Sequence, residues 1–229
     1  MQIQGFQKLT LLDYPGKVAC TIFTGGCNFR CPFCHNAGLV NGTGEEHYDP
    51  DTILATLQKR QGLLDGVCFT GGEPLLQPDI ADFIGRVRQM GFAIKLDTNG
   101  SFPERLQAIV DAGLVDYVAM DIKNAKARYA ETVGKADFDI APIEASVKYL
   151  LENHVDYEFR TTVVQEFHTL QDIVDIVTWI QGAPKYFLQN FVDSGNLLCP
   201  GLHGVPKETM EAMQVKACQI LPNTQLRGL

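Results

Sequence analysis

The chain lacks any long apolar segment and any excess of positive charge. No stretch of its 229 residues approaches the roughly 18 consecutive apolar residues that a membrane-spanning helix needs. Residues 1–16 contain no basic stretch followed by an apolar run, as a secretion signal would. Lysine and arginine number 19 against 27 aspartates and glutamates, a net charge of -8, which disfavours binding to nucleic-acid backbones. We therefore expect a soluble, cytoplasmic protein that neither enters a membrane nor binds nucleic acid.

The seven cysteines do not suit a disulfide framework, because their number is odd and the chain carries no secretion signal. Three of them, Cys27, Cys31 and Cys34, fall within eight residues. This clustering indicates metal or redox chemistry. The other four are expected to behave as small buried hydrophobic residues, and only Cys199 among them lies in a predicted loop: Cys20, Cys68, Cys199 and Cys218.

Short runs rich in β-branched and aromatic residues alternate with amphipathic segments along the chain. Six runs are predicted to form strands: residues 18–24, 67–70, 94–98, 117–121, 157–164 and 185–191. Apolar residues at helical spacing predict helices around residues 53–57, 80–90, 106–110, 143–151, 173–180 and 206–221. This alternation predicts right-handed βαβ units and a parallel sheet. Six strands are too few for a closed eight-stranded barrel, which leaves an open doubly wound sheet or a barrel open on one side.

Polar and glycine-rich residues recur where the predicted strands end. They are residues 25–27, 71–74, 97–100, 121–123 and 189–190, with Arg160 inside the fifth strand. Barrel enzymes build their sites on this rim, whereas a doubly wound sheet gathers them at one switch point. We therefore predict an α/β fold, a partial (β/α)6 barrel of parallel strands that is open on one side, formed by one domain over residues 1–229.

The cysteine cluster by itself leaves two interpretations. A structural zinc site needs four protein ligands, and His35 is the only candidate for the fourth. Four-iron clusters normally use four cysteines, so three leave one iron open to bind and activate a substrate. Phe29 and Phe33 would shield the cluster from water.

Two motifs resemble those of the radical S-adenosylmethionine superfamily. The first is the spacing Cys-x3-Cys-x2-Cys with Phe33 before the last cysteine, and the second is Gly-Gly-Glu-Pro at residues 71–74. Three segments are similar to the glycyl-radical-enzyme activating proteins, and most similar to those of anaerobic ribonucleoside-triphosphate reductase: residues 12–17, 22–36 and 96–100. Residues 120–123 resemble the matching stretch of the pyruvate formate-lyase activating enzymes.

The resemblance implies a cofactor set and a reaction. Cys27, Cys31 and Cys34 would hold one [4Fe-4S] cluster whose open iron chelates S-adenosylmethionine. Reductive cleavage would give methionine and a 5′-deoxyadenosyl radical, which takes a hydrogen atom from a backbone glycine of a partner enzyme. A flavodoxin or ferredoxin would supply the electron. Residues 35–51 contain no further cysteines, so we expect one cluster only.

The resemblance also implies roles for residues at the strand ends. Phe33, Gly71, Gly72, Glu73, Asp97, Asn99, Lys123 and Arg160 are predicted to bind the cofactor, with Glu73 supplying charge toward the ligand's ammonium. Asp121 is a candidate ligand for a monovalent cation. A mutual salt bridge explains Asp121 and Lys123 equally well, and Arg160 could instead balance Glu158 or an acid opposite it. His168 is expected to be structural. Related activating enzymes carry a histidine near the end of the sixth strand, and here Gln189 and Asn190 stand there.

Three functions therefore compete. The first is activation of a glycyl-radical enzyme, with anaerobic ribonucleotide reductase preferred over pyruvate formate-lyase. The second is a radical enzyme with a small-molecule substrate, such as a deazapurine-forming enzyme. The third is a zinc protein without catalytic activity.

Overall fold

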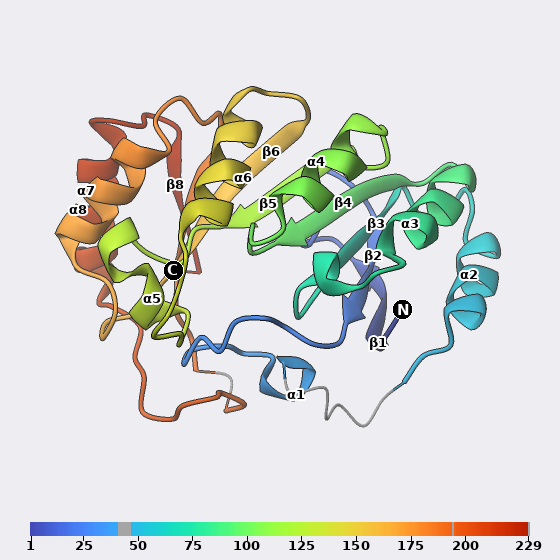
Figure 1. The fold of residues 1–229 in the computed structure, drawn as a ribbon, viewed down its shortest axis with the longest axis horizontal. Coiled ribbons are helices and arrows are strands. Elements are labelled where there is room, and N and C mark those ends of the chain that lie inside the picture. Colours follow the sequence, from blue (N-terminus) through green and yellow to red (C-terminus); the bar gives the residue numbers. More distant parts are fainter. Residues whose placement is uncertain (41–46, 194, 229) are drawn as a thin grey trace.

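One curved sheet of eight strands organises the chain. The computed structural model describes residues 1–40, 47–193 and 195–228. The strands follow each other in chain order: β1 (Ile3–Thr10), β2 (Ala19–Thr24), β3 (Gly66–Gly71), β4 (Ala93–Thr98), β5 (Tyr117–Asp121), β6 (Asp156–Val163), β7 (Tyr186–Asn190) and β8 (Thr224–Arg227). β1 is antiparallel to β2, and all later pairs are parallel. Within the described residues β1 and β8 do not pair with each other, so the barrel is open on one side (Figure 1).

Helices connect the parallel strands, and the longer ones cover the outer face of the sheet (Figure 1). They are α1 (Ala37–Val40), α2 (Pro50–Gln58), α3 (Ile80–Gln89), α4 (Pro103–Asp111), α5 (Tyr129–Thr132), α6 (Ala141–Leu151), α7 (Leu170–Trp179) and α8 (Lys207–Cys218), with the short 3₁₀ turns η1 (Pro74–Leu76) and η2 (Lys126–Arg128). No described helix has both the length and the apolar character needed to cross a membrane.

The two faces of the sheet differ in chemistry, because side chains alternate along each strand. Ile22, Phe69 and Leu96 belong to the hydrophobic core and are completely buried. The intervening positions carry polar groups: Thr21, Cys68 and Lys95 are aligned across β2, β3 and β4. These groups lie on the inner, concave face of the sheet.

The predicted α/β barrel open on one side is confirmed, and the six predicted strands are β2 to β7. Two strands were not predicted. Four of the eight residues of β1 are glutamine, lysine or glycine, which lowers its strand propensity, and it forms by pairing with β2. β8 has only four residues, too few for a periodic pattern. It extends the parallel sheet beyond β7 to a seventh parallel strand.

Candidate functional site

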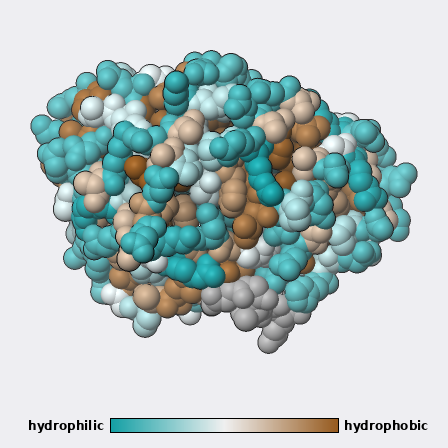
Figure 2. Space-filling view, in the orientation of Figure 1, coloured by the Kyte–Doolittle hydropathy of each residue, from teal (hydrophilic) through white to brown (hydrophobic). Residues whose placement is uncertain are grey.

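A cavity of about 250 Å³ opens at the carboxyl ends of the central parallel strands. The loop of residues 25–36, called the cysteine loop below, forms one wall. All predicted site residues except Glu73 line the cavity: Cys27, Cys31, Phe33, Cys34, Gly71, Gly72, Asp97, Asn99, Asp121, Lys123 and Arg160. In the orientation of Figure 1, the space-filling view shows apolar side chains near the centre of the molecule and hydrophilic ones around them (Figure 2).

The cysteine loop is held by backbone contact with residues 71–74. The N–H of Gly72 donates to the carbonyl of Thr24 (2.8 Å), and the N–H of Glu73 donates to the carbonyl of Gly26 (2.9 Å). A Cβ on Gly72 would lie 1.9 Å from the carbonyl oxygen of Gly26. Gly71 has φ +113° and would place a Cβ 2.5 Å from Thr24. Only glycine allows this approach at both positions.

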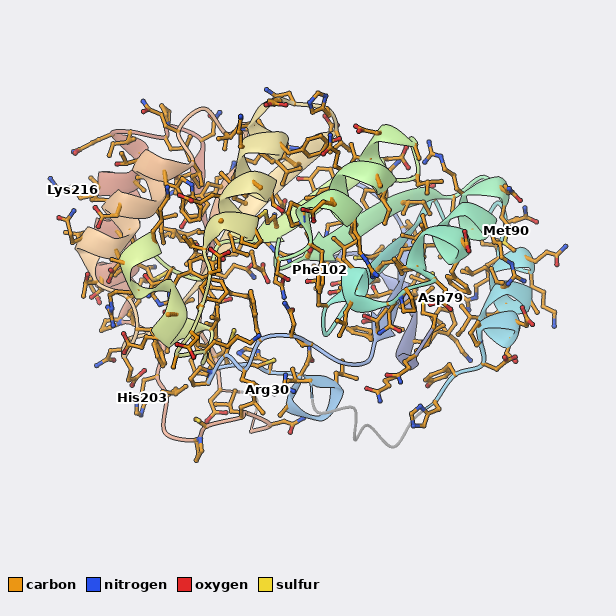
Figure 3. The ribbon with its side chains drawn as sticks, viewed as in Figure 1. Arg30, Asp79, Met90, Phe102, His203 and Lys216 are labelled. Atoms are coloured by element: carbon orange, nitrogen blue, oxygen red, sulfur yellow. The ribbon has the colours of Figure 1, made fainter. Side chains whose placement is uncertain are left out.

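The far end of the cysteine loop is tied to two other segments. The N–H of Arg30 donates to the carbonyl of Val133 (2.9 Å), just after α5. The N–H of Cys199 donates to the carbonyl of Pro32 (3.0 Å), which brings the exposed Cys199 next to the loop. Figure 3 shows Arg30 in the lower part of the view. The cysteine loop is therefore fixed along its length, although it has no regular secondary structure of its own. The short helix α1, residues 37–40, follows it directly.

The three thiols are free and lie in an environment that suits an iron–sulfur cluster. Burial raises the pKa of Cys27, and it raises the pKa of Cys31 to about 12, so a metal must displace the protons. Phe29 and Phe33 are buried beside them. The N–H of Phe29 donates to the sulfur of Cys27 (3.4 Å), a type of contact that tunes cluster potentials.

A zinc site in this loop does not fit the arrangement. Among the described residues, no three or more His, Cys, Asp or Glu side chains converge as they would on a single metal ion. His35 instead packs against the ring of Phe191, with centroids 5.1 Å apart. Three thiols without a fourth ligand match a four-iron cluster with one open iron better than a structural zinc ion.

Glu73 lies behind the cavity wall and is completely buried. Its carboxylate accepts hydrogen bonds from the N–H groups of Leu75 (3.0 Å) and Asn99 (2.7 Å) and from the hydroxyl of Thr98 (2.8 Å). Burial raises the pKa of Glu73 to about 7, although the three donors oppose the shift. We expected this carboxylate to point toward a ligand's ammonium. The structure instead uses it to join residues 71–74 to the end of β4.

Asn99 carries this connection on to the cysteine loop. Its side-chain Nδ2 donates to Oδ1 of Asn28 (3.0 Å) and lies 3.8 Å from the sulfur of Cys27. Asn28 in turn donates to the hydroxyl of Ser101 (2.8 Å). The predicted residue Asn99 therefore sits between the buried Glu73 and Cys27.

Charged side chains of alternating sign form the side of the cavity opposite the cysteine loop. Asp121 accepts from Lys123 (2.8 Å) through Oδ2 and from Nε of Arg160 (3.0 Å) through Oδ1. Nη1 of Arg160 also donates to Oδ2 of Asp97 (3.3 Å), and Lys95 donates to Oδ1 of Asp97. Asp97, Asp121, Lys123 and Arg160 line the cavity, and Lys95 lies behind Asp97 without lining it. We call these five residues together the cavity floor. Asp121 and Arg160 meet because they are register partners on β5 and β6.

The floor cations keep both carboxylates ionised. Although burial alone would raise it, the neighbouring Lys123 and Arg160 hold the pKa of Asp121 at about 2. Arg160 and Lys95 likewise outweigh burial and lower the pKa of Asp97. Arg160 thus balances two acids opposite it. Glu158 is paired with Arg227 instead, at 2.9 and 3.1 Å.

Two polar residues near the site were not assigned to it from the sequence. Lys95 is buried to 2% side-chain exposure. Its position two residues before Asp97 on a strand was the signal, since such residues share a face. His168 was expected to be structural, and its Nε2 lies 2.9 Å from the carbonyl of Lys123. Its Nδ1 accepts from the N–H of Val164 (3.1 Å), so Nε2 carries the proton and donates to Lys123.

Comparison with known proteins agrees with this arrangement. Residues 21–180 match the model of the Radical SAM superfamily, which covers more than half of the chain. The chain belongs to the radical SAM superfamily. A protein of Methanocaldococcus jannaschii, whose name assigns it to glycyl-radical enzyme activation, is 34% identical over 82% of this chain and 79% of its own length. The pyruvate formate-lyase-activating enzyme of Clostridium pasteurianum is 30% identical over 54% of this chain and 52% of its own length.

A solved structure shares the fold of this radical SAM chain. A domain of pyruvate-formate lyase-activating enzyme from Bacteroides vulgatus superposes with a TM-score of 0.59, over 71% of this chain and 99% of that domain, at 18% identity. Membership of the superfamily makes the chain an enzyme and implies a [4Fe-4S] cluster and S-adenosylmethionine as its cofactors. The three thiols and the cavity beside them fit that pair of groups.

Proposed function

We propose that this enzyme cleaves S-adenosylmethionine and generates a glycyl radical on a partner enzyme, namely anaerobic ribonucleoside-triphosphate reductase. The observation that carries the proposal is the meeting of three thiols, the close-packed turn at residues 71–74 and a charged floor around one cavity. The relative named for glycyl-radical enzyme activation, matched over 79% of its length, supports the partner class. The choice of the reductase rests on sequence resemblance to its activating proteins.

In this proposal Cys27, Cys31 and Cys34 hold one [4Fe-4S] cluster. When bound, the reduced cluster supplies the electron that breaks the C5′–S bond of S-adenosylmethionine. Gly71 and Gly72 bring backbone groups to the cavity wall where the ligand's amino-acid part would lie. Phe33 covers the cluster side of the cavity. It packs against Phe167 with centroids 5.7 Å apart, which limits water in the site.

The floor orients the ligand by charge. Lys123 and Arg160 both line the cavity, and each carries further N–H donors beyond those that Asp121 and Asp97 engage. These donors suit the ligand's carboxylate and ribose oxygens. His168 fixes the backbone of Lys123 through its carbonyl. Asn99 completes the wall between the floor and Cys27.

The open side of the barrel suits a protein substrate. Because β1 and β8 do not pair within the described residues, the inner face of the sheet can admit a peptide loop that a closed barrel would exclude. The 5′-deoxyadenosyl radical would then take the α-hydrogen of a glycine, giving 5′-deoxyadenosine and the glycyl radical. We further propose that residues 1–229 act as one domain, in the cytoplasm, with flavodoxin or ferredoxin as the electron donor.

Electron paramagnetic resonance on mixed proteins tests the proposal. The reconstituted enzyme, with about four irons per chain for one cluster, is reduced and mixed with S-adenosylmethionine and a reductase labelled with α-deuterated glycine. We expect a glycyl radical signal without the α-hydrogen splitting, and deuterium in 5′-deoxyadenosine. Deuterium transfer from pyruvate formate-lyase, and none from the reductase, would identify pyruvate formate-lyase as the partner. Cofactor cleavage without transfer from any glycyl-radical enzyme would favour a small-molecule substrate.

A further inference from the structure

The cavity floor holds more positive than negative charge. Lys95, Lys123 and Arg160 face two carboxylates, those of Asp97 and Asp121. Each of the four carboxylate oxygens accepts a hydrogen bond from one of these cations. Every carboxylate oxygen of the cavity floor is therefore already paired with a lysine or arginine side chain. This arrangement does not fit the expectation that Asp121 binds a monovalent cation.

We propose that the ammonium of Lys95, together with the guanidinium of Arg160, takes the place of a bound monovalent cation, so that the enzyme binds S-adenosylmethionine without added K⁺ or Na⁺. The inference rests on the proposed function, since it concerns the same ligand. It assigns Lys95 as a positioning residue. Lys95 does not line the cavity and acts by holding Asp97, which does.

The ammonium of Lys95 is buried and is therefore a permanent part of the site. The Lys95 side chain is 2% exposed and that of Asp97 is 15% exposed, and the ammonium also lies 3.8 Å from the sulfur of Cys68. Removing the ammonium would leave one oxygen of Asp97 buried without its charged partner, which is unfavourable. A further cation beside the three already present would be repelled, because charges interact strongly in a poorly solvated site.

The strand positions of these residues explain how Arg160 can serve two carboxylates while Lys95 serves one. Lys95 and Asp97 lie on β4, Asp121 on β5 and Arg160 on β6. The Lys95 ammonium pairs with Asp97, and Arg160 bonds both Asp97 and Asp121. The floor is thus neutralised by side chains fixed in the sheet, which leaves the cavity face of Lys123 and Arg160 for the ligand.

The test measures the affinity of the reconstituted, reduced holoenzyme for S-adenosylmethionine in KCl, NaCl and choline chloride at equal ionic strength. The readouts are calorimetric titration and the change in the cluster's electron paramagnetic resonance signal on binding. For the wild-type protein we expect the same Kd in all three salts. For Lys95→Met we expect Kd in choline chloride to rise at least about tenfold, the effect of one charged contact, and KCl to restore part of the affinity.

Two variants control for charge and folding. Lys185→Met removes a lysine that stacks on the ring of Tyr117, 4.9 Å from its centroid, and should leave Kd unchanged in every salt. Lys95→Arg keeps the charge and should retain salt independence. Iron content shows which variants assemble the cluster. If Lys95→Met does not assemble, the wild-type salt series alone decides the question.

A wild-type Kd that rises tenfold or more in choline chloride would overturn the proposal, as would a Lys95→Met protein that assembles its cluster and shows no salt effect. The proposed function fails separately. Salt-independent binding of S-adenosylmethionine without glycyl radical formation would refute the assigned partner and leave the role of Lys95 standing. Absence of binding in every salt would refute both.

Discussion

Replacing Gly72 with alanine should break the contact that holds the cysteine loop to the rest of the site. Gly72 does not have a positive φ, so the substitution is not excluded by backbone conformation. The new Cβ would lie 1.9 Å from the carbonyl oxygen of Gly26, where real contacts are essentially never under 3.0 Å. The two backbones must therefore separate by at least about 1 Å, and misplacement on that scale can lower activity about 100-fold.

The separation also removes two hydrogen bonds, from Gly72 to Thr24 and from Glu73 to Gly26. At a net contribution of about 1 kcal/mol each, their loss destabilises the site by about 2 kcal/mol. Gly72→Ala should therefore reconstitute with less iron and bind S-adenosylmethionine at least about tenfold more weakly, a change of about 1.4 kcal/mol.

Gly38→Ala is the matched control for this substitution. Gly38 lies in α1, just after the cysteine loop, and a Cβ there would meet no atom within 4 Å. Alanine also favours the helix by about 0.5–1 kcal/mol over glycine. We expect normal iron content and normal affinity from this variant. If Gly72→Ala matched Gly38→Ala in both measurements, the close approach of the two backbones would not be what assembles the site.

Two further predictions concern the thiols and Glu73. Cys31→Ala should abolish cleavage of S-adenosylmethionine, measured as 5′-deoxyadenosine, because a three-thiol site has no spare ligand. Cys218→Ala, which removes a thiol that donates to the carbonyl of Thr224 (3.5 Å), should leave cleavage almost intact, and equal losses would contradict the ligand assignment. Because burial raises the pKa of Glu73 from 4.5 to about 7, its contribution to stability should fall as pH rises through that window, by about 3 kcal/mol in total. In urea unfolding, the free energy of unfolding of the wild type should fall relative to that of Glu73→Gln between pH 4.5 and 8. Parallel pH profiles of the two proteins would refute the raised pKa of Glu73.

The central strands and the site residues on them could be predicted because local sequence determines both. β2 to β5 are short runs of β-branched, aromatic and apolar residues that end at glycine or at polar groups. In a parallel sheet those ends meet at one edge. Cys27, Gly71, Asp97 and Asp121 therefore had to lie near one another once the strands were assigned.

Contacts between side chains could not be predicted in the same way. Period-two alternation places Lys95 and Asp97 on one face but does not show which cation each carboxylate meets. The motif at residues 71–74 suggests a site without showing that the Glu73 carboxylate turns away from the cavity toward Thr98 and Asn99. The position of Cys199 beside Pro32 depends on the path of an irregular segment after β7, which has no periodic pattern.

The pairing of β2 with β3 explains why two motifs about 40 residues apart act as one unit. Thr24 and Gly71 are register partners on these parallel strands. The residues that follow them, residues 25–27 and 72–74, must therefore leave the sheet side by side, whatever the length of the connection through α2. These two segments can touch only because side chains are absent between them: a Cβ on Gly71 or on Gly72 would collide with Thr24 or with Gly26. The cysteine loop is thus placed by strand register and by the absence of two Cβ atoms.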